Sequence, residues 1–387
     1  MSWILPQKFI DMQAIPFNQP HVTGSEWVHI QEAIAQGKLS ANGSYTKKCQ
    51  QFFESTFGFN KVYLTHSCTQ ALEMAALLLD LGPADEVIVP SFAYVSTANA
   101  FALRGCRLVF ADSRLDYPGI DEVGIEKLIT SRTKALVIVH YAGIACHMDP
   151  IVALCKRHGI YLIEDAAAAL NGFYLNGDGK RLPLGSFGTL ATFSFHETKN
   201  IACGEGGMLV VNDPDLLAKA DTVWNRGTNR SDFERGRSTH YEWVSLGSAF
   251  GPSEINAAWL WAQLQKLEQI QKKRQEIWYW YQANLRRILP AFDGELPSVP
   301  PFSQQNYHSF YLVEGSLAKR EALIRYLHSK GIQSVSHYRC LHRSRYVSNR
   351  HTGAALVHAE KYQDRLLRLP FYADLDIAQL EENLLSA

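Results

Sequence analysis

The sequence predicts an α/β protein in which a large domain, built on a mostly parallel sheet between helices, precedes a smaller α+β domain. Three observations predict this class. Short runs rich in Val, Ile and Leu alternate with amphipathic helical patterns between about residues 60 and 215. These runs end in Pro, Gly, Ser or Asp, residue types that mark the passage from a strand into a turn. After residue 285 this alternation stops and a different pattern begins.

Seven apolar runs predict the strands of the sheet. Short runs of this composition are typical of strands that are buried on both faces. Because helices separate most of them, we expect a mixed sheet in which most neighbours are parallel. In chain order the runs are KVYLT (61–65), DEVIVPSF (85–92), CRLVFAD (106–112), KALVIVHYAG (134–143), IYLIEDAA (160–167), TLATFSFH (189–196) and GGMLVVND (206–213).

Helical patterns lie between and after these strands. The segments TQALEMAALLLDLG (69–82), GIDEVGIEKLIT (119–130) and DPIVALCKRHG (149–159) are amphipathic and have suitable ends. A longer helical pattern fills residues 253–286.

The last hundred residues predict the smaller domain. HSFYLVEG (308–315) and QSVSHY (333–338) are the predicted strands, with the predicted helix KREALIRYLHSKGI (319–332) between them and a final helical region after them. A chain of 387 residues exceeds the usual size of one core. We therefore expect a large domain over 1–285 and a small domain over 286–387.

The composition excludes several classes of protein. The 38 basic and 38 acidic residues cancel, so we expect no nucleic-acid partner and no anionic membrane partner. Seven cysteines without a CxxC pair favour a reducing cytoplasm and predict no metal site. The opening MSWILPQKFIDMQ lacks a basic region followed by an apolar run, so we expect no signal peptide. No apolar run reaches the roughly 18 residues of a membrane span.

Ligands of open α/β sheets bind beyond the carboxyl ends of the strands, so we examined the residues that follow each predicted strand. Ser67, Cys68 and Thr69 follow the first strand and open a helix. Free backbone N–H groups and the helix dipole make such a position suitable for a phosphate. The alternative is that Ser67 or Thr69 only caps the helix.

Two carboxylates end the fifth predicted strand. Glu164 and Asp165 close a segment that is otherwise too apolar to carry a charge without a cationic partner or a metal. No cluster of His, Cys and Asp supports a metal. The protonated ring nitrogen of a cofactor would serve as the partner of Asp165. The alternative is that Asp165 caps the following turn.

Lys199 also follows a predicted strand, in the segment FSFHETKNIACGEGG (193–207). A lysine that is removed from water has a lowered pKa and can form a Schiff base with an aldehyde. The alternative is an ordinary solvated loop lysine. Gly206 and Gly207 favour the first reading, because they indicate a close backbone approach that a side chain would prevent.

Tyr94, just beyond the second predicted strand, can stack on a flat ring, although a core or rim position is the alternative. His196 and His337 can contact a substrate or be packed histidines. Together, a phosphate cradle, an acid, an amine and an aromatic ring match pyridoxal 5′-phosphate.

These motifs give the sequence a clear resemblance to a known family. It resembles the sugar aminotransferases of the DegT/DnrJ/EryC1 (ArnB-like) family from residue 15 to residue 375, and FSFHETKN (193–200) is the most specific motif. The resemblance implies the aspartate aminotransferase fold type I, a seven-stranded sheet, pyridoxal 5′-phosphate as cofactor and a homodimer with shared active sites. It also implies a ping-pong transfer of an amino group from L-glutamate to a keto-deoxy nucleotide-sugar, in polysaccharide or antigen biosynthesis.

The resemblance assigns roles to individual residues. Lys199 would bind the cofactor covalently, and Asp165 would pair with its ring nitrogen. Ser194, with Cys68 and Thr69, would hold the phosphate, and Tyr94 would lie over the ring. RGTNR (226–230) and HYEWVSLGSAF (240–250) would lie near the shared site. The expected substrate-binding residues are His196, Arg226, Asn229, Arg230, Tyr241 and His337.

Two positions depart from the family pattern. Ala168 stands where the family usually has a glutamine beside the cofactor, and Ala249 stands where many members have an asparagine that reaches the partner's phosphate. Each lost contact is worth about 0.5–1.5 kcal/mol, so we expect weaker retention of the cofactor. A transaminase acting on 3-keto sugars and a degenerate, regulatory cofactor-binding member are the alternatives. Dehydratase relatives carry histidine in place of the lysine, so Lys199 argues against that branch.

Overall fold

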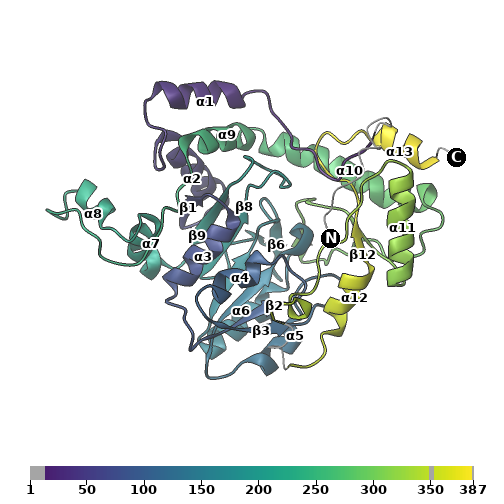
Figure 1. Ribbon diagram of the computed structural model, residues 1–387, viewed down its shortest axis with the longest axis horizontal. Helices are drawn as coiled ribbons and strands as arrows, with labels where there is room; N and C mark the ends of the chain where they lie inside the picture. Colours follow the sequence, from purple (N-terminus) through teal and green to yellow (C-terminus); the bar gives the residue numbers. More distant parts are fainter. Residues whose placement is uncertain (1–13, 348–352, 386–387) are drawn as a thin grey trace.

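The computed structural model describes residues 14–347 and 353–385. The opening segment (1–13), for which we expect no signal peptide, lies outside the described residues. Figure 1 shows a sheet-centred body with the C-terminal part of the chain packed at one side. Within the described ranges, no helix is both long enough and apolar enough to cross a membrane.

A seven-stranded sheet forms the centre, in the order β1-β9-β8-β5-β4-β2-β3. Neighbours are parallel except that β9 runs antiparallel to both β1 and β8. All seven predicted strands are therefore confirmed, most with slightly shorter bounds, and the sheet is mixed because of β9 alone. The strands are β1 (Lys61–Thr65), β2 (Glu86–Pro90), β3 (Arg107–Ala111), β4 (Thr133–Val139), β5 (Tyr161–Asp165), β8 (Leu190–Ser194) and β9 (Gly207–Val211).

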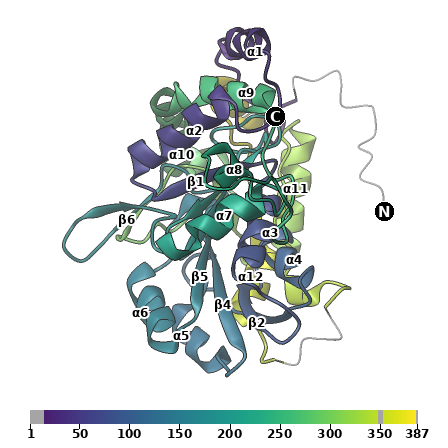
Figure 2. The same cartoon turned by 90° about the vertical axis from the view of Figure 1, so that its left-hand side faces the viewer.

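Helices cover both faces of this sheet because its strands are apolar on both faces. On β4, Leu136 and Ile138 enter one core cluster, whereas Ala135 and Val137 enter another. Figure 2 shows α6 on one side of the strands and α3 and α4 on the other. The first face is covered by α2 (Ser44–Phe57), α6 (Met148–His158) and α9 (Glu254–Leu264), and the second by α3 (Cys68–Leu78), α4 (Ser96–Ala102) and α7 (Leu217–Trp224).

Two predicted helices differ from the structure. The helix expected over 119–130 shrinks to α5 (Glu122–Ile125) and one 3₁₀ turn (Glu126–Leu128), because Ile129 is already extended as the chain turns into β4. The pattern over 253–286 divides into α9 and α10 (Leu267–Ile288). The break precedes the change of packing partners: Leu267 and Ile270, in the first turn of α10, still pack in the large core with α9, and only the second half of α10 packs in a third cluster.

The third cluster joins Ile15, the second half of α10 and the chain that follows. The predicted strand at 308–315 is present as β11, and it pairs antiparallel with β12, which the sequence did not indicate. The predicted strand over 333–338 is wrong, because this segment makes only one bridge, between Val335 and Arg368. The division at 285/286, which falls inside α10, remains a proposal. The elements are β11 (Tyr311–Val313), α11 (Leu317–Ser329), α12 (Val357–Arg365), β12 (Leu366–Arg368) and α13 (Ile377–Leu385).

Further short elements complete the fold. A small three-stranded sheet pairs segments far apart in the sequence. Figure 1 shows α1 lying above α9, and α8 on a segment that projects from the body. We call this segment, residues 226–249, the arm. These elements are α1 (Glu26–Ala35), β6 (Phe173–Leu175), β7 (Arg181–Pro183), α8 (Arg230–Glu234) and β10 (Ser303–Gln304), with 3₁₀ turns at Tyr141–Gly143, Pro214–Leu216 and Leu341–Arg343.

A buried carboxylate joins two of the covering helices. Glu254, in the first turn of α9, is 1% exposed. Its oxygens accept hydrogen bonds from the backbone N–H groups of Gly43 (3.0 Å), Tyr45 (2.7 Å) and Thr46 (3.1 Å) at the start of α2. The N-terminus of a helix has unpaired N–H groups and a positive dipole end, so this carboxylate satisfies both.

We expect Glu254→Ala to lower the free energy of unfolding by about 3 kcal/mol, because it leaves several buried N–H groups without an acceptor. Urea denaturation followed by circular dichroism measures this loss. Glu268→Ala is the matched control: it also removes a glutamate from the first turn of a helix, but Glu268 is exposed. A Glu254→Ala protein that is as stable as this control would contradict the assignment.

Candidate active site

A cavity of about 430 Å³ lies at the carboxyl edge of the sheet. Val139, Asp165 and Ser194 are at or near the ends of the parallel strands β4, β5 and β8, and all three line it. The structure thus brings together most of the residues predicted from strand ends. Those that line the cavity are Ser67, Cys68, Thr69, Tyr94, Asp165, Ala168, Ser194, His196, Lys199 and His337.

Lys199 enters the cavity from the loop after β8. Its backbone N–H bonds the carbonyl of His196 (2.9 Å), within a loop that Phe195 anchors through bonds to Cys203 and Gly206. The described residues offer its amine no hydrogen-bond partner. Removal from water, reinforced by the positive charge of Arg368, lowers the pKa of the Lys199 amine from 10.5 to about 8. It is therefore not an ordinary solvated loop lysine.

Asp165 closes β5 beneath the same cavity and is 4% exposed. It accepts a bond from the Thr97 hydroxyl (2.6 Å) and one from the Ala167 N–H (3.1 Å). Burial raises the pKa of its carboxyl against the opposing effect of Thr97 and of the Lys199 charge. The bond to Ala167 confirms the capping alternative, and it leaves room for a second role. A buried carboxylate with a raised pKa favours a cation beside it.

The neighbouring Glu164 fixes the end of the same strand. It is fully buried and accepts bonds from His140 Nε2 (2.9 Å) and from the N–H groups of Gly185 (2.8 Å), Phe187 (2.7 Å) and Gly188 (2.7 Å). His140 Nδ1 in turn accepts a hydrogen bond from the Cys146 N–H (3.2 Å). The ring proton is therefore on Nε2, which donates its hydrogen bond to Glu164. Glu164 therefore positions the strand end that carries Asp165.

The start of α3 faces the cavity with the features of a phosphate site. Ser67 is the N-cap, and its hydroxyl accepts from the Gln70 N–H (3.2 Å), so for Ser67 the capping alternative is confirmed. Cys68 and Thr69 begin the helix and line the cavity. A Cβ on Gly207 would lie 2.4 Å from the Cys68 nitrogen, so only glycine allows β9 to approach this turn. Such a helix N-terminus is a common binding site for phosphate.

Aromatic side chains form the opposite wall. Tyr94 is 56% exposed, so it lies at the rim and not in the core, with its ring 5.7 Å from that of Tyr338. His337 stacks on Tyr338 (5.1 Å) and meets Phe17 edge to face (5.9 Å). Burial and the charge of Arg368 lower the pKa of His337 to about 4, so this ring is neutral near pH 7.

Ala168 lines the cavity at the position where the family usually has a glutamine. Behind it, the Asn306 amide donates to the carbonyls of Ala168 and Leu170, each at 2.8 Å. A Cβ on Gly143 would lie 1.8 Å from the Asn306 oxygen, so glycine is required there. Asn306 fixes the turn after β5 and does not line the cavity, so the weaker cofactor retention expected from Ala168 stays a prediction.

Sequence reasoning missed several residues that line the cavity. Ser96 and Thr97 lie two and three residues after Tyr94, where the start of a helix could have indicated them. Tyr141 lies two residues beyond the end of β4, so its place after a strand could also have indicated it. Others come from segments that reach the cavity only by long-range packing, and local patterns give no signal for them. They are Phe17, His308, Ser309, Tyr338 and Arg368.

Five predicted residues lie outside the cavity of the described chain, on the arm that carries α8. Asn229 bonds Ser238 (3.1 Å) and the His240 carbonyl (2.8 Å), and so closes the arm on itself. Any contact of this arm with an active site would therefore require a second chain, and the predicted roles remain proposals. These five residues are Arg226, Asn229, Arg230, Tyr241 and Ala249.

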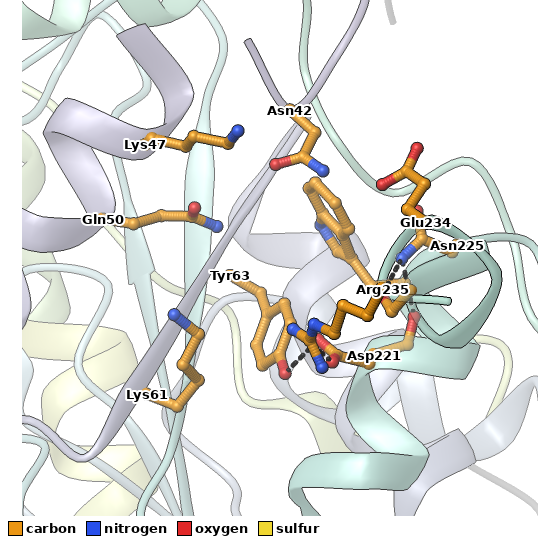
Figure 3. A pocket seen from close by; sticks show the side chains of 11 residues that line it. Asn42, Lys47, Gln50, Lys61, Tyr63, Asp221, Asn225, Glu234 and Arg235 are labelled. Atoms are coloured by element: carbon orange, nitrogen blue, oxygen red, sulfur yellow. Dashed lines mark hydrogen bonds and ion pairs between the residues drawn. The ribbon is translucent and has the colours of Figure 1, made fainter. Parts of the chain in front are cut away.

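A second recess of about 290 Å³ lies between α2, β1 and α7, beside the arm. Figure 3 shows Lys47 and Lys61 pointing into it from one side and Arg235 from the other. Tyr63 donates to Asp221 (2.9 Å), and Arg235 lies 3.5 Å from the same carboxylate. This recess shares no lining residue with the Lys199 cavity.

Comparison with known proteins extends this picture. A model of the DegT/DnrJ/EryC1/StrS aminotransferase family matches residues 22–383. The aminotransferase TlmJ of Streptoalloteichus hindustanus is 28% identical, with 96% of each chain covered and a TM-score of 0.85. DesV of S. venezuelae is 27% identical over 96% of this chain and 97% of its own, with a TM-score of 0.84. The aminotransferase PseC of Helicobacter pylori is 25% identical over 96% and 97%, with a TM-score of 0.85.

Fold and site together define an enzyme of fold type I that depends on pyridoxal 5′-phosphate. The residues of the cavity fit this cofactor, because they combine a phosphate cradle, a carboxylate that favours a cation and an amine with a lowered pKa. The chain belongs to the DegT/DnrJ/EryC1/StrS aminotransferase family, and it is a sugar aminotransferase.

We expect the Lys199 amine of the cofactor-free protein to react with trinitrobenzenesulfonate at a rate that rises through about pH 8, because only the neutral amine is a nucleophile. Peptide mapping by mass spectrometry resolves the site. Lys319 is the control in the same sample: Asp293 raises the pKa of its amine above 10.5, so its labelling must begin at higher pH. Labelling of both lysines over the same pH range would contradict the lowered pKa of Lys199.

Proposed function

We propose that this enzyme moves the amino group of L-glutamate to a keto-deoxy nucleotide-sugar. The first substrate we name is dTDP-4-keto-6-deoxyglucose, which makes the enzyme a dTDP-4-amino-4,6-dideoxygalactose transaminase of polysaccharide or antigen biosynthesis in the cytoplasm. The observation that carries the proposal is the lone Lys199 amine above the buried Asp165 in one cavity. PseC, which the chain resembles, takes part in the biosynthesis of pseudoaminic acid.

The cavity residues fit pyridoxal 5′-phosphate, which when bound supplies an electron sink for the carbon that gives up or receives the amino group. The Ser67–Thr69 turn and Ser194 would hold its phosphate, and Lys199 would hold it covalently. Asp165 would keep the ring nitrogen protonated, because ionised Asp165 is most stable beside a cation.

Lys199 also moves protons in the proposed reaction. Its amine, with a pKa of about 8, exists in both protonation states near neutral pH. It can therefore act as a general base, which takes a proton from the carbon that carries the amino group of the donor, and then as a general acid, which gives a proton back.

We propose a homodimer with shared active sites. The arm exposes several large apolar side chains, and single exposed apolar residues are common but a group of them marks an interface. If a second chain received this arm, Arg226, Tyr241 and Ala249 of the first chain would lie near the cavity of the second chain. The exposed group is Tyr241 (54%), Trp243 (75%), Val244 (52%) and Leu246 (58%).

Lys199→Ala should abolish transamination, with a loss of at least about 10⁴-fold, because it removes both the covalent anchor and the general base. The assay offers L-glutamate with a panel of 4-keto and 3-keto nucleotide-sugars and detects the amino-sugar by mass spectrometry. Turnover that persists in Lys199→Ala would overturn the mechanism. Wild-type turnover of 3-keto sugars alone would replace the 4-keto assignment, and turnover of none would favour the regulatory alternative.

Mixing two inactive variants tests the shared site. Lys199→Ala keeps its arm, and Arg226→Ala with Tyr241→Ala keeps its lysine. If each site uses the arm of the partner chain, refolding both variants together should restore roughly a quarter of wild-type activity, because half the dimers are mixed and half of their sites are complete. Affinity capture of one variant that carries a tag, which must also recover the untagged variant, is the control for subunit exchange. A mixture no more active than the sum of its components would refute shared sites.

A further inference from the structure

A buried arginine without a carboxylate partner lies beside the Lys199 cavity. Arg274, in the first half of α10, is 2% exposed, and no described residue forms an ion pair with it. Its guanidinium donates instead to the backbone carbonyls of Tyr307 (3.1 Å) and His308. Burial lowers the pKa of this guanidinium to about 9, with a further contribution from the charge of Arg368, so Arg274 is a cation near pH 7. A buried charge without a counterion costs folding free energy, which a role at the neighbouring site would explain.

Hydrogen bonds connect Arg274 to the loop that carries Lys199. His308, whose carbonyl Arg274 binds, lines the cavity, and its Nδ1 lies 3.0 Å from the side-chain oxygen of Asn200. Asn200 directly follows Lys199 in the chain, and its amide nitrogen donates to the Asn306 carbonyl (2.8 Å). Asn200, Asn306 and His308 are all buried. The loop of Lys199 is therefore tied to the segment that Arg274 holds in place.

The ring of His308, which stands between Arg274 and the cavity, is neutral. The amide nitrogen of Asn200 donates to a carbonyl, so its oxygen faces the ring and can only accept a hydrogen bond. The ring proton is therefore on Nδ1. Burial lowers the pKa of His308, and three neighbouring cations act in the same direction. The positive charge on this side of the cavity is therefore that of Arg274 and not that of the histidine in front of it.

The amine of Lys199 is the titratable group on which this charge acts. Removal from water and the charge of Arg368 contribute most to its lowered pKa, and Arg274 adds to both, whereas Cys68 and Asp165 act in the opposite direction. Because Arg274 does not line the cavity, a ligand in the cavity does not pair with its guanidinium, and its effect on the amine stays constant. The titratable side chains that line the cavity with Lys199 are Cys68, Tyr94, Tyr141, Asp165, His196, Glu205, His308, His337, Tyr338 and Arg368.

We propose that Arg274 is a positioning residue for the transfer of the amino group: it holds the loop of Lys199 through the bonds described above, and its charge favours the neutral amine whatever occupies the cavity. This inference rests on the proposed function, in which the amine of Lys199 is the general base. A general base must be neutral when the donor arrives. A buried cation that no ligand reaches meets this condition without competing for the substrate.

The pH at which the Lys199 amine becomes reactive tests this role. Arg274→Met removes the charge, and Arg274→Gln removes the charge but can still donate to a carbonyl. In the cofactor-free protein, each should raise the midpoint of Lys199 labelling by trinitrobenzenesulfonate by roughly 0.5 to 1 pH unit, the usual effect of one nearby charge. Arg287→Gln is the matched control, because Arg287 is exposed on the same helix and pairs with Glu381 (2.7 Å). It should leave the midpoint unchanged.

A titration of the holoenzyme completes the test. The absorbance of the bound cofactor, followed against pH, should change at a higher pH in Arg274→Gln than in wild type, because one cation that opposes protonation is lost. Circular dichroism shows which variants are folded, and Arg274→Gln decides the matter if Arg274→Met does not fold. An unchanged labelling midpoint in folded Arg274→Gln, or an equal shift in Arg287→Gln, would overturn the inference. If the midpoint shifts but wild type aminates no sugar, the proposed function fails and the effect of Arg274 on the amine stands.

Discussion

The structure depends on holding an amine and a carboxylate out of water at one edge of a parallel sheet. Burial acts on Lys199 and Asp165 in opposite directions: it lowers the pKa of the amine and raises that of the carboxyl, so that it favours the neutral form of each. Their mutual attraction opposes both shifts without cancelling them. A cofactor with an aldehyde for the amine and a basic ring nitrogen for the acid relieves both costs, which explains why these two residues occupy one cavity.

Such a pair needs a rigid support, and buried polar groups provide it. Glu164 lies directly before Asp165 and binds three backbone N–H groups and His140, so the end of β5 cannot shift without breaking several bonds at once. Gly207 allows β9 to approach the start of α3, which keeps the phosphate cradle next to the strand end that leads to Lys199. The same contacts that stabilise the sheet therefore set the distances within the site.

The sequence predicted the sheet well because each strand is apolar on both faces, and that signal is local. It predicted several cavity-lining residues that follow strands of the large domain, because parallel strands bring their carboxyl ends to one edge. It failed at 333–338, where contacts with Arg368 and the aromatic wall replace a strand ladder. It also missed Arg368 and His308, because only the docking of the C-terminal segment brings them to the cavity. The arm residues lie outside the cavity, and the role we propose for them requires a second chain.

The two parts of the cavity wall contribute different properties. Strand ends of the sheet supply Asp165 and Ser194, with Lys199 just beyond, and these are the residues to which we assign the transfer of the amino group. The C-terminal segment supplies His337, Tyr338 and Arg368, which add two rings and one cation to the wall of the cavity. His337 stays neutral near pH 7 because burial and the charge of Arg368 both oppose its protonation. The residues to which we assign the transfer and those that shape the rest of the wall therefore come from different parts of the chain.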